Sequence, residues 1–290
     1  MAHVEPRLDL KWSRESTLAT RVIVDFMSKM RQMPLVQLST LGDVNNDISS
    51  ASNVCRGSEF IHLVLDSYVE MSLKEGERLR RSDEAAGIDI IGMGRDTNLQ
   101  KLDKFWASEA NKQNLQLLVR DIVCNQASVN LTIIASSVVS DDEALPARVS
   151  GNEEIPELLN WIEEANTRLV AHVEWAVRVK QCQSCRNVQR HRHLRVIATL
   201  HSTLPGTAGF EGHLAAVCGT GEKRRMLPLH QAIAQLGTPL AKTMIKAHIW
   251  TGDDCMSKVG TKHAAEACDP VQYLTNFRER DIPCRSKTKH

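Results

Sequence analysis

Two short apolar runs, each closed by an aspartate, constrain the fold of this chain more than any other feature. The first covers residues 22–26 and reads V-I-V-D-F around Asp25, and the second covers residues 61–65, reads I-H-L-V-L and is followed by Asp66. Continuous apolar runs of this length are typical of strands that are buried on both faces of a parallel sheet. Ligands of open α/β sheets gather at the carboxyl ends of such strands, which makes both aspartates candidate site residues.

Helical patterns alternate with the apolar runs. A third strand is expected over residues 131–139, and helices are expected over residues 71–81, 104–123, 156–179, 228–236 and 239–250. The helix over 156–179 has the clearest signals, because a proline stands in its first turn, Glu153 and Glu154 precede it, and an apolar stripe follows at helical spacing. Strands that alternate with helices predict an α/β fold with a mostly parallel sheet flanked by helices.

The domain organisation follows from the extent of these patterns. We expect an N-terminal extension over residues 1–19, a single α/β domain over residues 20–280 and a disordered tail over residues 281–290. No internal repeat divides the chain.

Composition excludes several function classes. The net charge of +1 gives no argument for a nucleic acid or a membrane as partner, and the 4% aromatic content argues against a stacking platform for single strands. No apolar run approaches the roughly 20 residues of a membrane span, and the N-terminus lacks a secretory h-region. The scattered cysteines are typical of reduced thiols, so we expect an intracellular protein without a membrane partner. Compartment and oligomeric state are left open.

Further acidic residues follow or lie within the predicted helices. Glu163 and Glu164 lie in the long helix, and Asp253 and Asp254 follow the last one. Carboxylates that converge from several strand ends suit Mg²⁺ or Mn²⁺, and two such ions about 4 Å apart can clamp both reacting oxygens of a phosphodiester. Each acid taken alone fits equally well as an ordinary solvated residue, so spacing by itself does not identify a nuclease.

Taken as a set, these segments resemble the superfamily of PIN-like nucleases and flap endonucleases. The similarity lies in V-I-V-D-F-M-S-K-M-R, in H-L-V-L-D-S-Y-V-E-M-S-L-K-E-G-E-R-L-R-R, in I-E-E-A-N-T-R-L and in W-T-G-D-D-C-M-S-K-V-G-T-K, and it covers most of residues 20–280. Within that superfamily the chain is most similar to uncharacterised, multicopy animal proteins associated with mobile elements, which share D-K-F-W-A-S-E-A-N-K.

The resemblance implies roles for individual residues. It implies metal ligation and catalysis by Asp25, Asp66, Glu164 and Asp254, and contacts to a nucleic-acid backbone by Lys74, Arg80, Arg81, Gly260 and Lys262. The superfamily's E-A-D motif reads E-A-N here, so Asn166 is a weakened metal ligand: its neutral amide oxygen binds a hard dication less well than a carboxylate does. The implied cofactor is Mg²⁺ or Mn²⁺, and the implied partner is DNA or RNA.

The stretch from Cys182 to His193, C-Q-S-C-R-N-V-Q-R-H-R-H, departs from this pattern. It begins a segment without Asp or Glu between Glu174 and Glu211. One interpretation is a zinc site of Cys182, Cys185, His191 and His193, although the short gap between the two pairs and the H-x-H spacing fit a zinc finger poorly. The other interpretation, which we favour, is a basic loop with two incidental cysteines.

The superfamily carries D-T-D-T where this chain has R-H-R-H. Shifting the reading frame by one nucleotide permits D-T-D-T at this place, and both flanks then rejoin the superfamily pattern. We therefore hypothesise that residues 182–218 are an out-of-frame product of paired indels. Because burying several unpaired cations is costly, we expect residues 182–218 to form an irregular surface loop and the sheet to lack one core strand.

These considerations favour a degenerate nuclease domain. Its ancestors would have cut phosphodiesters with divalent metals, and this chain would be weak or inactive because cations replace two carboxylates. The alternative is a non-catalytic nucleic-acid-binding or interaction protein that contacts phosphates through Lys74, Arg78, Arg80, Arg81 and the arginine-rich loop that begins at Cys182.

Overall fold

The computed structural model describes part of the chain. The described residues are 21–30, 40–43, 58–68, 89–98, 102–125, 131–140, 143–151, 153–162, 165–180, 184–188, 213–218 and 225–228, together with Gln231 and Gln235. The predicted helices over 71–81 and 239–250, the N-terminal extension and the predicted tail lie outside them. None of the described helices is long and apolar enough to cross a membrane.

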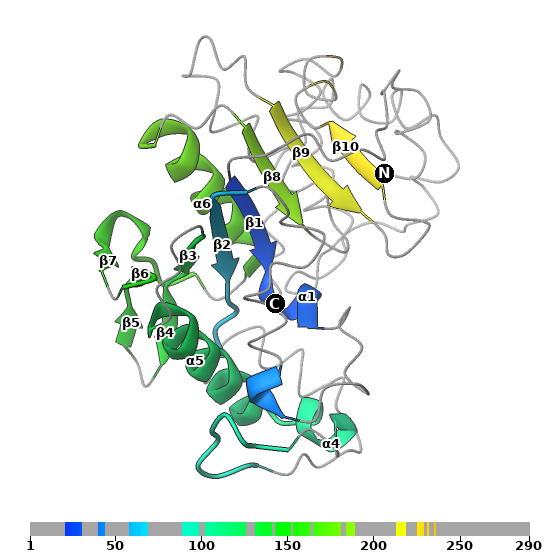
Figure 1. Ribbon diagram of the computed structural model, residues 1–290, viewed down its shortest axis with the longest axis vertical. Coiled ribbons are helices and arrows are strands. Elements are labelled where there is room, and N and C mark those ends of the chain that lie inside the picture. The colour runs from blue at the N-terminus through cyan, green and yellow to red at the C-terminus, as the bar shows by residue number, and fades with distance from the viewer. Residues whose placement is uncertain are drawn as a thin grey trace, which may run out of the picture.

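The centre of the structure is a mixed sheet whose middle strands are parallel (Figure 1). Its strand order is β10-β9-β8-β1-β2-β3-β6-β7. The strands are β1 (Arg21–Asp25), β2 (Phe60–Val64), β3 (Thr132–Ala135), β6 (Ala147–Val149), β7 (Glu154–Ile155), β8 (Ser184–Val188), β9 (His213–Cys218) and β10 (Arg225–Pro228). The pairs β3–β2, β2–β1, β1–β8 and β8–β9 are parallel, whereas β6, β7 and β10 add antiparallel edges.

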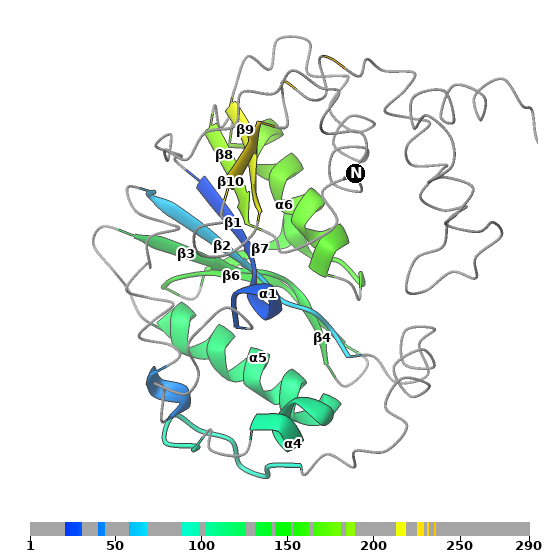
Figure 2. The ribbon, with the colours of Figure 1, turned by 90° about the vertical axis from the view of Figure 1, so that its right-hand side faces the viewer.

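Helices cover both faces of this sheet, as Figure 2 shows. Helix α6 (Ala165–Arg178) lies on one face, and α4 (Leu102–Ala107) and α5 (Glu109–Asn125) lie on the other. The short helix α1 (Phe26–Met30) follows β1 directly. The arrangement confirms the predicted α/β class and the helical prediction over 104–123, apart from a break at Ser108, whose hydroxyl accepts a hydrogen bond from Asn111 N at 3.0 Å.

Among the described residues, the hydrophobic core consists of two clusters, one on each face of the sheet. Val22, Ile61 and Ile133 belong to the large cluster that includes Leu115 of α5, whereas Ile134 belongs to a smaller cluster with Trp175 of α6. Successive side chains of a strand point to opposite faces, so Ile133 and Ile134 of β3 belong to different clusters, whereas alternate residues of the two apolar runs belong to the large one. This confirms that the two runs identified in the sequence are buried strands.

The third predicted strand, over 131–139, is two strands in the structure. It divides into β3 and β4 (Val138–Ser140), and β4 leaves the main sheet to pair with β5 (Glu143–Leu145). The break falls at Ser136 and Ser137, whose hydroxyls donate to the carbonyl oxygens of Ser137 and Asn160 at 2.9 and 3.0 Å. Serine hydroxyls that bond to nearby backbone groups compete with the ladder of a strand, which explains the interruption.

The helix predicted over 156–179 is wrong in its first third. Residues Pro156–Leu158 form a single 3₁₀ turn, Leu159 is extended, residues 160–162 are in neither helix nor strand, and the α-helix begins only at Ala165. The Asn160 amide stops the helix earlier, because its Nδ2 donates to Leu158 O at 2.9 Å and its Oδ1 accepts from Ile162 N at 3.2 Å. Glu154, expected before the helix, lies instead in β7.

The expectation that residues 182–218 form an irregular loop and that the sheet lacks a strand is also wrong. Ser184–Val188 form β8, which pairs in parallel with β1, and His213–Cys218 form β9, which pairs in parallel with β8. The expectation failed because a strand pairs through its backbone, and only Arg186 of the cations in this segment falls within β8. Residues 189–212 lie outside the described part of the chain.

The start of the helix predicted over 228–236 also differs. Pro228 ends strand β10, and only Gln231 and Gln235 within this segment are described as helical. Proline is tolerated at the end of an edge strand, because the N–H that it lacks is not needed there for a hydrogen bond to a neighbouring strand.

Candidate metal centre at the carboxyl edge of the sheet

Asp25 and Asp66 lie at the same edge of the sheet. Asp25 is the last residue of β1, and its register partner in β2 is Val64, two residues before Asp66. The chain passes from β1 to β2 to β3 on one side and places β8 on the other side of β1. This reversal of strand order is the place where open α/β sheets bind ligands. The structure confirms that the two aspartates follow neighbouring parallel strands, whereas their role as metal ligands stays a prediction.

Each of the two carboxylates also has a structural contact. Asp25 Oδ1 accepts a hydrogen bond from Ser28 N at 2.8 Å and so caps α1. Asp66 Oδ1 accepts one from Ala165 N at 2.9 Å, which caps α6 from a distant part of the chain. Carboxylates stabilise the free N–H groups and the positive end of a helix in this way.

Asp66 also connects the two faces of the sheet. Its backbone N donates to Gln116 Oε1 of α5 at 2.6 Å, while its side chain binds the first residue of α6. Gln116 is itself fully buried, and its Nε2 donates to Lys112 O at 3.2 Å. The aspartate is thus positioned by both helices, and a change at Asp66 will alter packing as well as charge.

The other candidate ligands are described in part or not at all. Asn166 follows Ala165 in the first turn of α6, close in sequence to the N–H that Asp66 binds, and nothing is described of its side chain. Glu164 and Asp254 lie outside the described residues, as do Lys74, Arg78, Arg80, Arg81, Gly260 and Lys262. Within the described ranges, no three His, Cys, Asp or Glu side chains group in a way that could hold a metal ion.

The two carboxylates at this edge are suitable ligands for Mg²⁺ or Mn²⁺, but they form only part of a metal site. Two carboxylates supply hard oxygen ligands, but such ions take six or more oxygens and commonly keep several waters. Asp25 and Asp66 can therefore contribute to a metal site without completing one.

A buried arginine beneath this edge was not recognised in the sequence. Arg168 of α6 is fully buried, and its Nη1 donates to Leu65 O and to Ser137 O, both at 2.8 Å. Its Nη2 donates to Ser67 Oγ at 2.5 Å and its Nε to Asn160 Oδ1 at 3.2 Å. These bonds connect the ends of β2 and β3 with Asn160 in the segment before α6.

The serines around Arg168 complete this network. Ser136 Oγ accepts from Leu65 N at 2.9 Å, and Ser67 Oγ accepts from Val139 N at 2.8 Å. A sequence signal existed: Arg168, His172 and Trp175 recur at helical spacing beside the apolar stripe, so they share one face of the helix. A polar residue on the buried face of a helix requires partners, and it identifies a buried network.

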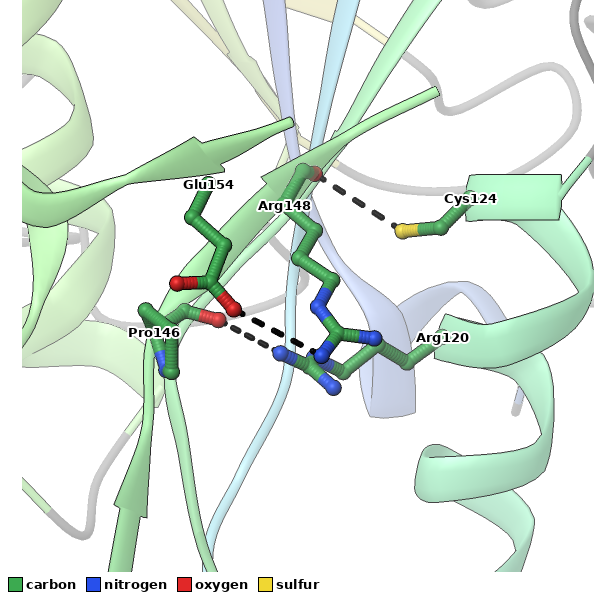
Figure 3. Close-up of polar contacts among 5 residues, drawn as sticks. All are labelled: Arg120, Cys124, Pro146, Arg148 and Glu154. Atoms are coloured by element: carbon green, nitrogen blue, oxygen red, sulfur yellow. Dashed lines mark hydrogen bonds and ion pairs between the residues drawn. The ribbon is translucent and has the colours of Figure 1, made fainter. Parts of the chain in front are cut away.

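A second polar cluster lies between α5 and the antiparallel edge (Figure 3). Arg120 Nη2 donates to Pro146 O at 2.5 Å, Arg148 pairs with Glu154 at 3.5 Å, and Cys124 Sγ donates to Arg148 O at 3.8 Å. Burial raises the pKa of the Cys124 thiol, and burial followed by the neighbouring Arg148 lowers the pKa of Arg120. Cys124 is a free thiol held in its protonated, unreactive form, in agreement with the prediction of reduced cysteines.

The zinc interpretation of the Cys182–His193 stretch stays untested. Cys185 lies in β8, where nothing is described of its side chain, and Cys182, His191 and His193 lie outside the described residues.

Comparison of the chain with protein-family models, with curated proteins and with solved structures found no match.

Proposed function

We propose that this chain is a degenerate domain of the PIN-like and flap-endonuclease type, descended from metal-dependent phosphodiester nucleases and weak or inactive as a nuclease itself. The observation that carries the proposal is the position of Asp25 and Asp66 at the carboxyl ends of neighbouring parallel strands, where the strand order reverses. If a divalent ion binds there, it supplies charge stabilisation for a phosphodiester.

The reduced activity in this proposal rests on the donors that the edge lacks. The register of β8 sets Val188 beside Val24, so the chain leaves β8 next to the end of β1. The sequence that follows reads Q-R-H-R-H and contains no carboxylate. Cations in place of two acids disfavour a dication by direct repulsion. Asn166 in place of an acid acts in the same direction.

A cleavage assay on flapped DNA and on RNA, with Mg²⁺ or Mn²⁺, tests the proposal. The informative variants are Asp25→Asn and Asp66→Asn, because asparagine keeps the oxygen that caps α1 or α6 and removes only the negative charge. Asp121→Asn serves as the matched control, since Asp121 is exposed on α5. We expect cleavage by the full chain to be weak or absent, and any residual cleavage to disappear in both variants and to persist in the control.

The outcomes separate the parts of the proposal. Robust cleavage that is lost in Asp66→Asn would keep the site and contradict the loss of activity. Cleavage that survives both variants would remove the site assignment altogether. Binding of nucleic acid without cleavage, with an affinity that falls steeply with salt, would favour the non-catalytic alternative.

A further inference from the structure

A pair of histidines joins the sheet to α6 inside the core. His62 is the middle residue of β2, and its register partners are Ile23 of β1 and Ile134 of β3. It therefore stands in an apolar row on the face that α6 covers (Figure 2). His172 reaches it from α6, and both side chains are fully buried. The two rings meet edge to face at 5.3 Å between centroids.

The hydrogen bonds determine which nitrogen of each ring carries the proton. Arg21 Nη1 lies 3.3 Å from His62 Nε2, and because arginine only donates, this Nε2 is the acceptor. The proton of neutral His62 is then on Nδ1, which donates to His172 Nδ1 at 3.0 Å. The proton of neutral His172 is consequently on Nε2, which is buried without a hydrogen-bond partner among the described residues.

A further proton has no favourable place in this chain of bonds. The two free lone pairs belong to His62 Nε2 and His172 Nδ1, and each already accepts a hydrogen bond. Protonation of either atom replaces a hydrogen bond by two opposed N–H groups and adds a buried charge. In agreement, burial, then His172 and Arg21, lower the pKa of His62 well below its usual range, and burial, then Arg168, lower the pKa of His172 to about 3.

The charged groups around the pair strengthen this effect. β1 contributes Arg21, whose guanidinium lies 3.9 Å from the Phe60 ring centroid, and α6 contributes Arg168. Glu157, on the 3₁₀ turn that packs against α6, is exposed and does not act on either ring. The side chains of β8, the remaining strand beside α6, are outside the described set. The described charges that act on the two rings are therefore cationic.

We propose that His62 and His172 form an acid-sensitive latch, which holds α6 on the sheet while both rings are neutral and releases it when either ring is protonated. The latch acts on α6 alone, because α5 packs on the opposite face through the apolar cluster of Leu115 and Val119. Release of α6 would also free its N-terminus from Asp66. The latch is independent of any nuclease activity.

Hydrogen exchange of the full chain between pH 7.5 and 5.0, read by mass spectrometry and corrected for the intrinsic pH dependence of exchange, tests the latch. The opening constant is the equilibrium constant between closed and released α6. If a histidine is neutral in the closed state and has its ordinary pKa of 6.5 in the released state, this constant rises by about 30-fold from pH 7.5 to pH 5.0. Two such histidines raise it by about 900-fold. We expect residues 165–178 to lose protection accordingly and to stay less protected than residues 109–125 of α5 at each pH, because local release of α6 costs less free energy than unfolding of the whole domain.

Two variants identify the groups responsible. In His172→Asn the Oδ1 atom replaces Nδ1 as acceptor and takes up no proton, so the pH response of α6 should fall from about 900-fold to about 30-fold. Glu174→Gln removes a titratable group from the same helix outside the pair and should keep the wild-type response. The comparison of α6 with α5 in the wild-type chain needs no variant, so the test stands even if His172→Asn does not fold.

Three results would overturn the proposal. The first is protection of α6 that does not change with pH. The second is equal protection of α6 and α5 at every pH, which would mean that α6 opens only when the whole domain unfolds. The third is a Glu174→Gln variant without the pH response, which would assign the response to the surface carboxylate.

Discussion

Replacement of Arg168 by methionine should destabilise the domain severely, and the structure allows the loss to be estimated. Among the described contacts, the guanidinium donates hydrogen bonds to Leu65 O, Ser137 O, Ser67 Oγ and Asn160 Oδ1. A hydrogen bond from a charged group contributes about 1.5–3 kcal/mol net, and a buried acceptor left without its donor costs about 1–3 kcal/mol.

The four bonds do not contribute equally to this loss. Ser137 O keeps a donor in Ser136 Oγ, and Ser67 Oγ keeps one in Val139 N. Leu65 O is the acceptor for which the loss of Arg168 matters most. Methionine fills much of the vacated volume and also relieves the desolvation of a buried charge. We therefore expect Arg168→Met to lower the free energy of unfolding by about 3 kcal/mol, well below the sum of four bonds.

Urea denaturation followed by circular dichroism measures this loss. Arg168→Lys keeps the charge but not the planar arrangement of donors, so it should lose about 1–2 kcal/mol. Arg178→Met is the matched control on the same helix, because Arg178 forms an exposed ion pair with Glu174 at 3.2 Å and should lose under about 1 kcal/mol. An Arg168→Met variant as stable as Arg178→Met would refute the reasoning, because the buried network would then contribute nothing measurable.

Three further predictions follow from the other described contacts. Because the folded pKa of His172 is about 3 and the ordinary value is 6.5, the unfolded chain binds more protons between these limits, and urea titrations should show stability falling by about 1.4 kcal/mol per pH unit below pH 6 for this histidine alone. Stability that stays constant from pH 7 to pH 5 would contradict the assignment. Asp25→Ala, which removes the cap on Ser28 N, should cost about 1 kcal/mol in the same assay, whereas Asp25→Asn should cost only a few tenths. An equal loss in both would show that charge, not capping, is what stabilises this position. Cys124 should react with a thiol reagent only after unfolding, as peptide mapping of the labelled chain can establish, and rapid labelling at neutral pH would mean that the thiol is accessible.

Local patterns in the sequence were sufficient to predict β1, β2 and the longest described helix, α5. The apolar runs around Asp25 and before Asp66 are strands, and the pattern over 104–123 is helical, because continuous burial and helical spacing are both visible along the chain. The position of the two aspartates at one edge followed from the parallel pairing of their strands. The metal-ligand, nucleic-acid and frame-shift hypotheses stay predictions, since most of their residues lie outside the described part of the chain.

Contacts between distant segments decided the features that the sequence analysis missed. Helix α6 begins at Ala165 rather than at Pro156 because Asp66, 99 residues earlier, caps it and because the Asn160 amide bonds to the backbone of Leu158 and Ile162. Strand β8 forms despite the basic composition around it because β1 and β9 offer backbone partners on both sides.

The sequence by itself determined that the runs around Asp25 and before Asp66 are buried strands and where their closing aspartates stand, since periodicity and apolar content are local properties. The pairing of His62 with His172 depends on two segments 110 residues apart, and the role of Arg168 depends on three. In the sequence, a buried polar side chain is visible only as a polar residue that interrupts an apolar pattern. Its partners, and hence its protonation state and its contribution to stability, exist only once the tertiary structure brings those segments together.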